Sequence, residues 1–158
     1  MPFTIFESPL GELTLVADSD RVLRRLYFPG TAPALSAADH DPEALAAATE
    51  QLEQYFAGER TRFELKLDAT GTPFQRSVWD ALRAIEYGTT TTYGALARQL
   101  GAQPRAVGSA VGSTPIPIVI PCHRVIGSDG SLTGYGGGLP RKRALLELEA
   151  GVSQLVPQ

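Results

Sequence analysis

Apolar and polar residues alternate along the first third of the chain with the period of two that is typical of half-buried β-strands. The alternating runs are bounded by turn residues, and they predict strands at 3–7, 12–17 and 22–28. A helical spacing of apolar residues follows over 42–56 and stops at Gly58, and alternation returns over 61–67. These elements predict a small α+β domain built on an antiparallel meander.

From Thr72 onward the apolar spacing becomes helical, starting with Thr72 as an N-cap and Pro73 at the first helical position. The spacing predicts helices at 72–87, 93–100, 104–112 and 140–149. Gly101-Ala102-Gln103 joins the second of these helices to the third, which favours a helix-turn-helix. We therefore predict an α+β fold, with an N-terminal domain at 1–68, a linker near 68–72 and a mainly helical domain at 72–158.

Composition narrows the function classes. The chain has 158 residues and one cysteine, so it has no intramolecular disulfide, which fits a reducing compartment. Cys122, His40 and His123 are too few for a structural zinc site. We find no apolar run long enough to span a membrane and no basic, signal-like N-terminus. The sequence indicates a cytoplasmic protein without a structural zinc site.

Charge is divided unevenly along the chain. Residues 1–71 carry six Lys/Arg and twelve Asp/Glu, whereas residues 72–158 carry eight Lys/Arg and five Asp/Glu. The overall charge of −3 therefore hides a basic C-terminal half, which is the half suited to a polyanion.

The segment 104–112 combines one charge, Arg105, with mostly small residues. Helices that read the major groove of DNA need long polar side chains, and this helix has only one. Small residues instead let a helix backbone approach a narrow groove or pack tightly against a neighbouring element, and the pattern leaves both readings open.

A Pro-punctuated apolar run ends by placing Cys122 and His123 side by side, followed by Arg124. A thiol becomes a nucleophile when a base or a cation favours its deprotonation. A third group is needed to orient the imidazole, and the acidic candidates downstream are Asp129, Glu147 and Glu149. Residue types alone do not choose among these three.

The segment 127–138 is rich in glycine but lacks the Lys-Ser/Thr ending of a phosphate-binding loop. We interpret it as a loop that shapes a pocket, with Tyr135 as one wall. The basic residues 141–143 enter the last helix where its dipole disfavours them, so they face either an anion or solvent.

Ile120-Pro121-Cys122-His123-Arg124-Val125 resembles the active-site motif of the O6-alkylguanine-DNA alkyltransferases, also called methylated-DNA–protein-cysteine methyltransferases. The resemblance covers roughly residues 72–151, and residues 1–68 match the family's variable N-terminal domain only in outline. The other matching segments, in the family's order and spacing, are Thr72-Pro73-Phe74-Gln75, Thr92-Tyr93-Gly94, Arg105-Ala106-Val107-Gly108 and Gly134-Tyr135 through Glu149.

The resemblance implies a role for each matching position. Cys122 would be the irreversible alkyl acceptor, His123 the base acting on it through a water, and Glu149 the carboxylate that orients His123. Tyr93 would help to rotate the nucleotide and donate to guanine N3, and Arg105 would enter the duplex in place of the extruded nucleotide. The resemblance further implies DNA contacts at Ala106, Gly108, Thr72, Gln75 and Arg124, and a substrate pocket formed by Tyr135, Gly136, Val125, Thr114 and Lys142.

One position departs from the family pattern. The family carries Asn where this chain has Thr114, and that Asn ties the recognition helix to the active-site strand. A hydroxyl offers one donor where a carboxamide offers two. The departure predicts a slower transfer reaction rather than its absence.

The resemblance therefore implies a single-turnover DNA repair protein that binds duplex DNA in the minor groove, flips an O6-alkylated guanine and takes its alkyl group onto Cys122. We expect it to act as a monomer that needs no metal or other cofactor. A lesion binder or damage regulator with little transfer activity is the main alternative, because of Thr114. A cysteine hydrolase using Cys122, His123 and Glu149 is a more remote one. Turnover distinguishes the three classes.

Overall fold

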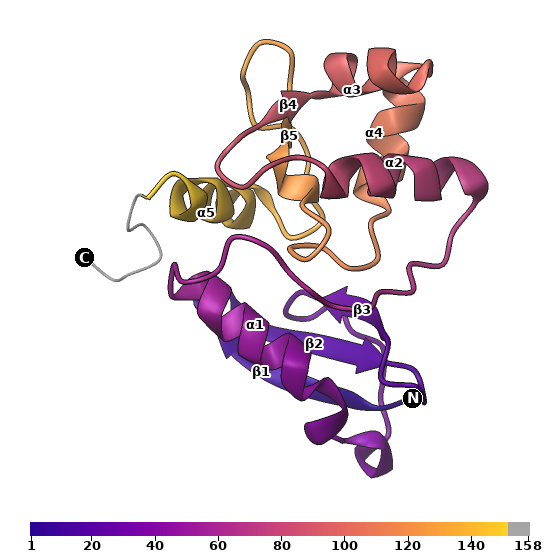
Figure 1. Ribbon diagram of the computed structural model, residues 1–158, viewed down its shortest axis with the longest axis vertical. Helices are drawn as coiled ribbons and strands as arrows, with labels where there is room; N and C mark the ends of the chain where they lie inside the picture. The colour runs from indigo at the N-terminus through magenta and orange to yellow at the C-terminus, as the bar shows by residue number, and fades with distance from the viewer. Residues whose placement is uncertain (152–158) are drawn as a thin grey trace. The chain divides into compact units, whose positions relative to one another are not determined.

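A computed structural model describes residues 1–151, which form two compact units (Figure 1). The first unit is Met1–Ala69, and the second begins at Thr70. The C-terminal domain expected from the sequence extends to residue 158, and its last seven residues lie outside the described range.

The first unit contains an antiparallel meander of three strands in the order β1-β2-β3. The strands are β1 (Phe3–Ser8), β2 (Gly11–Ala17) and β3 (Leu23–Tyr27). Phe3 pairs with Val16 and Ser8 with Gly11, so a two-residue turn joins the first two strands. Alternate residues of β2, such as Leu13 and Leu15, are fully buried, as the period-two pattern predicts.

Helix α1 (Ala46–Phe56) lies across the sheet (Figure 1) and follows a 3₁₀ turn at Glu43–Leu45. A second 3₁₀ turn, Ala37–Asp39, lies within the polar loop before it. Leu52 and Tyr55 are the most buried side chains of α1 and face the core. The helix predicted at 42–56 is therefore present, with a tighter first turn.

The fourth strand predicted at 61–67 is wrong. This segment touches β3 only near Leu67, where Leu23 donates to the Lys66 carbonyl and accepts from the Asp68 amide. Earlier in this segment, the Gln51 side chain on α1 accepts from the Glu64 amide at 2.8 Å and donates to the Glu64 carbonyl at 3.2 Å. A side-chain amide thus replaces the neighbouring strand that the alternating pattern anticipated.

The second unit begins with α2 (Pro73–Arg83), whose start is fixed by a capping box between Thr72 and Gln75. The helix ends four residues before the predicted end at 87. Ala84 and Ile85 donate to carbonyls three residues back, at Ala81 and Leu82, so the chain tightens and leaves the helix there.

The predicted helix-turn-helix is confirmed by α3 (Tyr93–Leu100) and α4 (Pro104–Gly112). The Thr92 hydroxyl caps α3, and Gly101 ends it in the left-handed conformation, with φ of 63°. The buried Trp79 indole of α2 donates to the Ala110 carbonyl of α4 at 2.9 Å, which ties the two helices together.

After α4 the chain passes through a buried apolar segment to a 3₁₀ turn at Cys122–Arg124 and then to β5 (Val125–Ile126). Strand β5 pairs in parallel with β4 (Thr91–Thr92), which immediately precedes α3. The last helix within residues 1–151 is α5 (Leu139–Glu149), which begins one residue before the predicted start. Among residues 1–151 no helix has both the length and the hydropathy needed to cross a membrane.

Candidate functional site

The backbone before Cys122 is folded tightly enough to fix the position of the thiol. The Cys122 amide donates to the Ile120 carbonyl at 2.7 Å, across Pro121. Two residues before Ile120, Ile118 has φ of 74°. This left-handed conformation is rare for a β-branched residue and costs roughly 1–3 kcal/mol. Ile118 is almost fully buried, so its packing imposes this conformation. The thiol is therefore held by a rigid segment.

The Cys122 side chain is buried, with 4% of the residue exposed. Burial raises the pKa of the thiol to about 11, while hydrogen bonding from Thr114 and Tyr135 and the positive charge of Lys142 act in the opposite direction. At neutral pH the resting sulfur therefore carries its proton. A nucleophilic reaction at this sulfur needs a nearby base.

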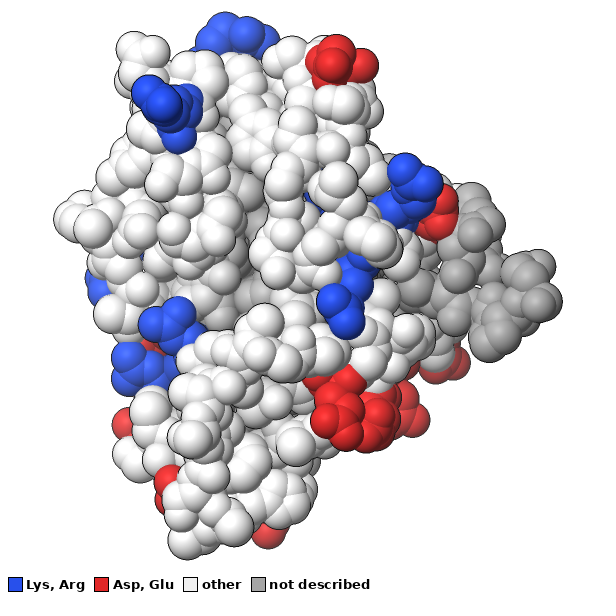
Figure 2. All heavy atoms as spheres, turned by 180° about the vertical axis from the view of Figure 1, so that it is seen from behind, with Lys and Arg blue, Asp and Glu red and all other residues white. Residues whose placement is uncertain are grey.

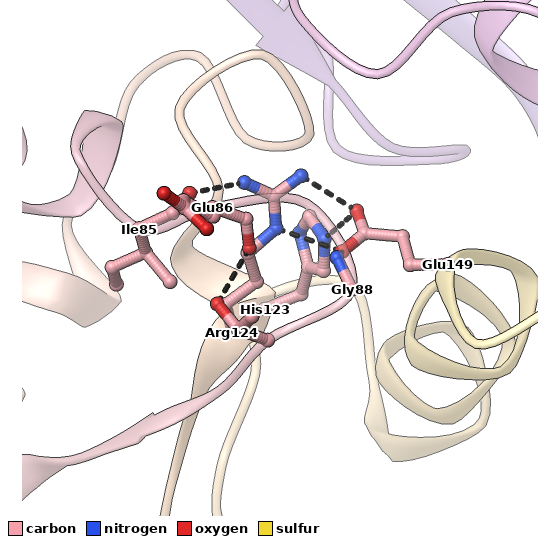
Figure 3. Close-up of polar contacts among 7 residues, drawn as sticks. Ile85, Glu86, Gly88, His123, Arg124 and Glu149 are labelled. Atoms are coloured by element: carbon pink, nitrogen blue, oxygen red, sulfur yellow. Dashed lines mark hydrogen bonds and ion pairs between the residues drawn. The ribbon is translucent and has the colours of Figure 1, made fainter.

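His123 is fully buried, and its Nε2 lies 2.7 Å from Oε2 of Glu149 (Figure 3). Because an ionised carboxylate only accepts, Nε2 carries the proton of this hydrogen bond. The buried Nδ1 has no hydrogen-bond partner among residues 1–151. Burial lowers the pKa of His123, and Glu149 opposes that change. His123 is thus a neutral imidazole with one nitrogen able to accept a proton.

The structure brings one of the three acidic candidates to His123. Glu149 lies in the last turn of α5, 26 residues after His123, and its carboxylate is buried. Asp129 is exposed and accepts from the amide and hydroxyl of Ser131, which hold the pKa of Asp129 below its usual value. Folding therefore selects Glu149, the position that the family resemblance implies.

Arg124 has a different environment from the one expected for a DNA contact. It is 6% exposed, and its Nε and Nη2 lie 2.7 and 2.9 Å from the two oxygens of Glu149 (Figure 3). Its Nη1 donates to the Ile85 carbonyl at 2.6 Å, and its guanidinium lies 5.7 Å from the Tyr87 ring centroid. We correct the expected DNA contact to an internal one, because every nitrogen of this guanidinium is used inside the second unit.

Lys142 is also buried, although it belongs to a basic run on α5. Its ammonium donates to the Thr133 carbonyl at 3.0 Å and lies 5.9 Å from the Tyr93 ring centroid. Burial lowers the pKa of Lys142. This side chain therefore joins the glycine-rich loop to α5 beside Tyr93, rather than facing solvent.

The remaining residues expected in the pocket differ in their exposure. Val125 is fully buried, Tyr135 is half-buried and Gly136 is exposed. The Thr114 hydroxyl donates to the Val111 carbonyl at 2.6 Å, at the end of α4. A methyl group at Gly108 would lie 3.8 Å from the Tyr93 ring, so α4 approaches that tyrosine through a residue without a side chain.

The residues expected on the DNA side lie at two helix starts. Arg105 and Ala106 are exposed in the first turn of α4. Thr72 and Gln75 use their side-chain oxygens on each other's backbone amides, at 3.1 and 2.9 Å. The structure therefore shows a capping function for both, of which the sequence predicted only that of Thr72.

Two family models match the chain. The model described as "6-O-methylguanine DNA methyltransferase, ribonuclease-like domain" matches residues 1–69. The model described as "6-O-methylguanine DNA methyltransferase, DNA binding domain" matches residues 73–151. Together they account for nearly the whole of the described chain.

Curated relatives are similar over more than nine tenths of the chain. The methylated-DNA–protein-cysteine methyltransferase of Mycobacterium tuberculosis (strain H37Rv) is 49% identical over 154 residues, covering 93% of this chain and 91% of the relative. The protein of the same name from Methanosarcina acetivorans is 46% identical over 154 residues, covering 94% and 98%.

Solved structures show the same fold. A crystal structure of Mycobacterium tuberculosis OGT in complex with DNA has a TM-score of 0.88 and 50% identity, covering 96% of this chain and 94% of that one. An O6-methylguanine DNA methyltransferase from Methanococcus jannaschii has a TM-score of 0.72 and 31% identity, covering 100% and 96%.

Proposed function

The chain belongs to the 6-O-methylguanine DNA methyltransferase family, and from that premise we propose that it repairs DNA by taking the alkyl group of an O6-alkylated guanine onto Cys122. The observation that carries the proposal is the buried arrangement of Cys122, His123 and Glu149. His123 is held by Glu149 through Nε2 and keeps its Nδ1 available as a base, directly after the chain's single cysteine.

The reaction follows from this arrangement. The thiol proton of Cys122 passes to Nδ1 of His123, through one water as the family resemblance implies. The sulfur then attacks the alkyl carbon, an S–C bond forms, and the C–O bond breaks with its electron pair leaving on the guanine. Tyr93 donates a proton to the departing guanine, and the thiol proton held on His123 then replaces it on the Tyr93 oxygen through water, so that the net change is transfer of the alkyl group to sulfur and of the thiol proton to guanine. The imidazolium formed at His123 is stabilised by the Glu149 carboxylate at 2.7 Å.

The product is a thioether, and none of the groups placed at the site cleaves an S–C bond. Each molecule therefore reacts once. This outcome separates the proposal from a cysteine hydrolase, whose thiol is regenerated in every cycle. It also separates it from a lesion binder or damage regulator, whose thiol is never modified.

The DNA partner is supported by the exposed start of α4. Arg105 enters the duplex in place of the extruded nucleotide, and the small side chains of Ala106 and Gly108 let the helix backbone come close to the minor groove. Thr72 and Gln75 at the start of α2 are further contacts. Tyr135, Gly136 and Val125 form the walls around the alkyl group.

A reducing location is supported by the reaction, because the single acceptor thiol must stay reduced. We therefore propose a cytoplasmic protein. We also propose that it acts as a monomer, because all the groups used in the reaction belong to the second unit of one chain.

Intact mass after incubation with duplex DNA containing O6-methylguanine tests the proposal. We expect one added methyl group per chain, located on Cys122, and none in Cys122→Ala, which should still bind the duplex. Several repaired lesions per chain with an unmodified thiol would identify a hydrolase. Binding of the lesion without any adduct would identify a binder or regulator.

A further inference from the structure

We propose that Arg124 is a positioning residue for alkyl transfer, which fixes the Glu149 carboxylate against His123 and so reserves the second imidazole nitrogen for the thiol proton. The proposal rests on the proposed function, because it assigns a part in the same reaction. It replaces the DNA contact that the sequence suggested for Arg124.

The first support is the geometry of the ion pair. Nε and Nη2 of Arg124 lie 2.7 and 2.9 Å from Oε1 and Oε2 of Glu149, a two-point contact that fixes the plane of the carboxylate (Figure 3). Oε2 also lies 2.7 Å from Nε2 of His123. The orientation of the imidazole is therefore set through a carboxylate that has little freedom to rotate.

The second support is that Arg124 is itself anchored. Its Nη1 donates to the Ile85 carbonyl at 2.6 Å, just after α2, and its guanidinium faces the Tyr87 ring. The Gly88 amide lies 3.4 Å from Oε1 of Glu149, a long contact from the same loop. The loop after α2 and the last turn of α5 are thus joined through one guanidinium.

The third support is electrostatic. Glu149 raises the pKa of His123, whereas burial and the positive charges of Arg124 and Lys142 lower it, and the net direction is downward. Among residues 1–151, Cys122, itself protonated, and the phenol of Tyr87 are further titratable groups beside this cluster. Arg124 therefore offsets the charge of Glu149, so that His123 keeps the hydrogen bond without being protonated before the reaction.

Lysine does not reproduce this arrangement. Its single ammonium nitrogen cannot span both oxygens of Glu149 and the Ile85 carbonyl, whereas the guanidinium presents its donors in a fixed plane. Arg124→Lys therefore separates geometry from charge, because it keeps the positive charge and loses the two-point contact. Arg124→Gln loses both.

The test is the pH dependence of transfer from free O6-benzylguanine to the full-length protein, which removes DNA affinity from the measurement. We expect Arg124→Lys to be roughly ten- to a hundredfold slower at every pH, the effect of a misplacement on the order of 1 Å. The acid limb of its pH profile, which is the range where the rate falls as pH is lowered, should stay near that of the wild type. In Arg124→Gln the acid limb should also move to higher pH by about one unit, because a nearby positive charge is gone.

Arg83→Lys is the matched control, because Arg83 is an exposed arginine in the last turn of α2, and it should behave as the wild type. A merely structural role for Arg124 would lower the thermal unfolding temperature without moving the acid limb of the folded protein. Folded Arg124→Lys and Arg124→Gln proteins with wild-type rates and pH profiles would overturn the proposal.

A second measurement does not depend on how the variants fold. The chain has two histidines, His40 and His123, so imidazole nitrogen NMR with His40→Gln as the assignment variant reads the His123 tautomer. We expect the proton on Nε2, and a proton on Nδ1 would overturn the proposal. Failure of the wild type to form a Cys122 adduct would instead contradict the proposed function.

Discussion

Thr114 has one hydroxyl proton, and its side chain lies beside two acceptors, the Val111 carbonyl and the sulfur of Cys122. Its Oγ1 donates to the Val111 carbonyl at 2.6 Å, and the same side chain hydrogen-bonds the sulfur of Cys122. As the sulfur becomes a thiolate it requires a donor, and a hydroxyl has only one. The hydroxyl therefore donates either to the Val111 carbonyl, which also accepts from the Thr114 amide at 3.3 Å, or to the developing thiolate.

The first prediction concerns this shared proton. Thr114→Asn should accelerate transfer by about tenfold, because a carboxamide has two donors and a hydrogen bond to a charged group is worth about 1.5–3 kcal/mol. DNA affinity should change little. Single-turnover kinetics on a methylated duplex give the rate, and Thr114→Val, which has no donor, should be slower than the wild type. A neutral or slower Thr114→Asn would show that the chain compensates elsewhere.

The second prediction concerns stability at alkaline pH. Burial raises the pKa of Cys122 to about 11, from the model-compound value of 9.0. Between these values the unfolded chain loses the thiol proton while the folded chain keeps it, so the free energy of unfolding falls as pH rises. The loss should reach about 2 kcal/mol by pH 11.

Urea unfolding at pH 8 and near pH 11 measures this effect against Cys122→Ala. Other groups titrate in the same range, including Lys142, but they are common to both proteins. The wild type should lose more stability than Cys122→Ala over the interval. Parallel pH dependence in the two proteins would mean that the thiol is not desolvated in the folded state.

At the scale of elements, local signals in the sequence predict the helices to within a few residues but wrongly predict a strand at 61–67. Thr72 caps α2 as predicted, and Thr92 and Gly101 bound the helix predicted at 93–100. The segment 61–67 has the alternation of a strand, but the partner of its Glu64 backbone is a side chain 13 residues earlier on α1. Alternation reports which face of a segment is buried and does not identify its hydrogen-bond partner.

In the functional site, too, the sequence predicts some features and only the folded structure shows the others. Adjacent residues such as Cys122 and His123 are visible in the sequence, and the residues alone left three acids open. Arg124 was misassigned because a guanidinium beside an active-site motif has the same sequence signal whether it faces DNA or a buried carboxylate. Only the packing of α5 against the 3₁₀ turn at Cys122–Arg124 distinguishes the two.

The third prediction belongs to α4. Arg105→Ala should slow repair of methylated duplex far more than attack on free O6-benzylguanine, because only the duplex substrate requires extrusion of a nucleotide. Unstacking costs on the order of a few kcal/mol, so the difference between the two substrates should be at least tenfold. Single-turnover rates on both substrates measure it. Equal losses would show that Arg105 acts on the chemical step.

At the scale of the whole molecule, the two halves of the sequence differ in net charge, and the overall charge of −3 hides this difference. Charged residues gather in separate groups on the face drawn in Figure 2, with uncharged surface between them. Of the eight Lys/Arg in residues 72–158, Arg124 and Lys142 are buried, which leaves six that phosphates can reach. The count of eight Lys/Arg in residues 72–158 therefore overstates the number of positive charges available to DNA phosphates.

The fourth prediction is a moderate salt dependence. Each neutralised phosphate contributes about −0.9 to the slope of log affinity against log salt, so six available cations set a limit near −5. Equilibrium binding of the full chain to duplex DNA at several salt concentrations measures the slope. Glu50→Gln on α1, in the acidic unit, should leave it unchanged. A steeper slope, or one altered by Glu50→Gln, would place phosphates on the first unit as well.

Because Glu149 lies at the end of α5, the ribosome adds Cys122 and His123 to the chain before it adds the carboxylate that orients His123. Twenty-six residues separate it from His123, a distance that a ribosome translating 5–20 residues per second covers in roughly 1–5 seconds. During that interval the nascent thiol has neither its buried surroundings nor an oriented base. A chain interrupted before α5 carries the acceptor atom without the means to activate it. For a protein used up by one reaction, activation of the thiol is thereby postponed until its last helix is in place.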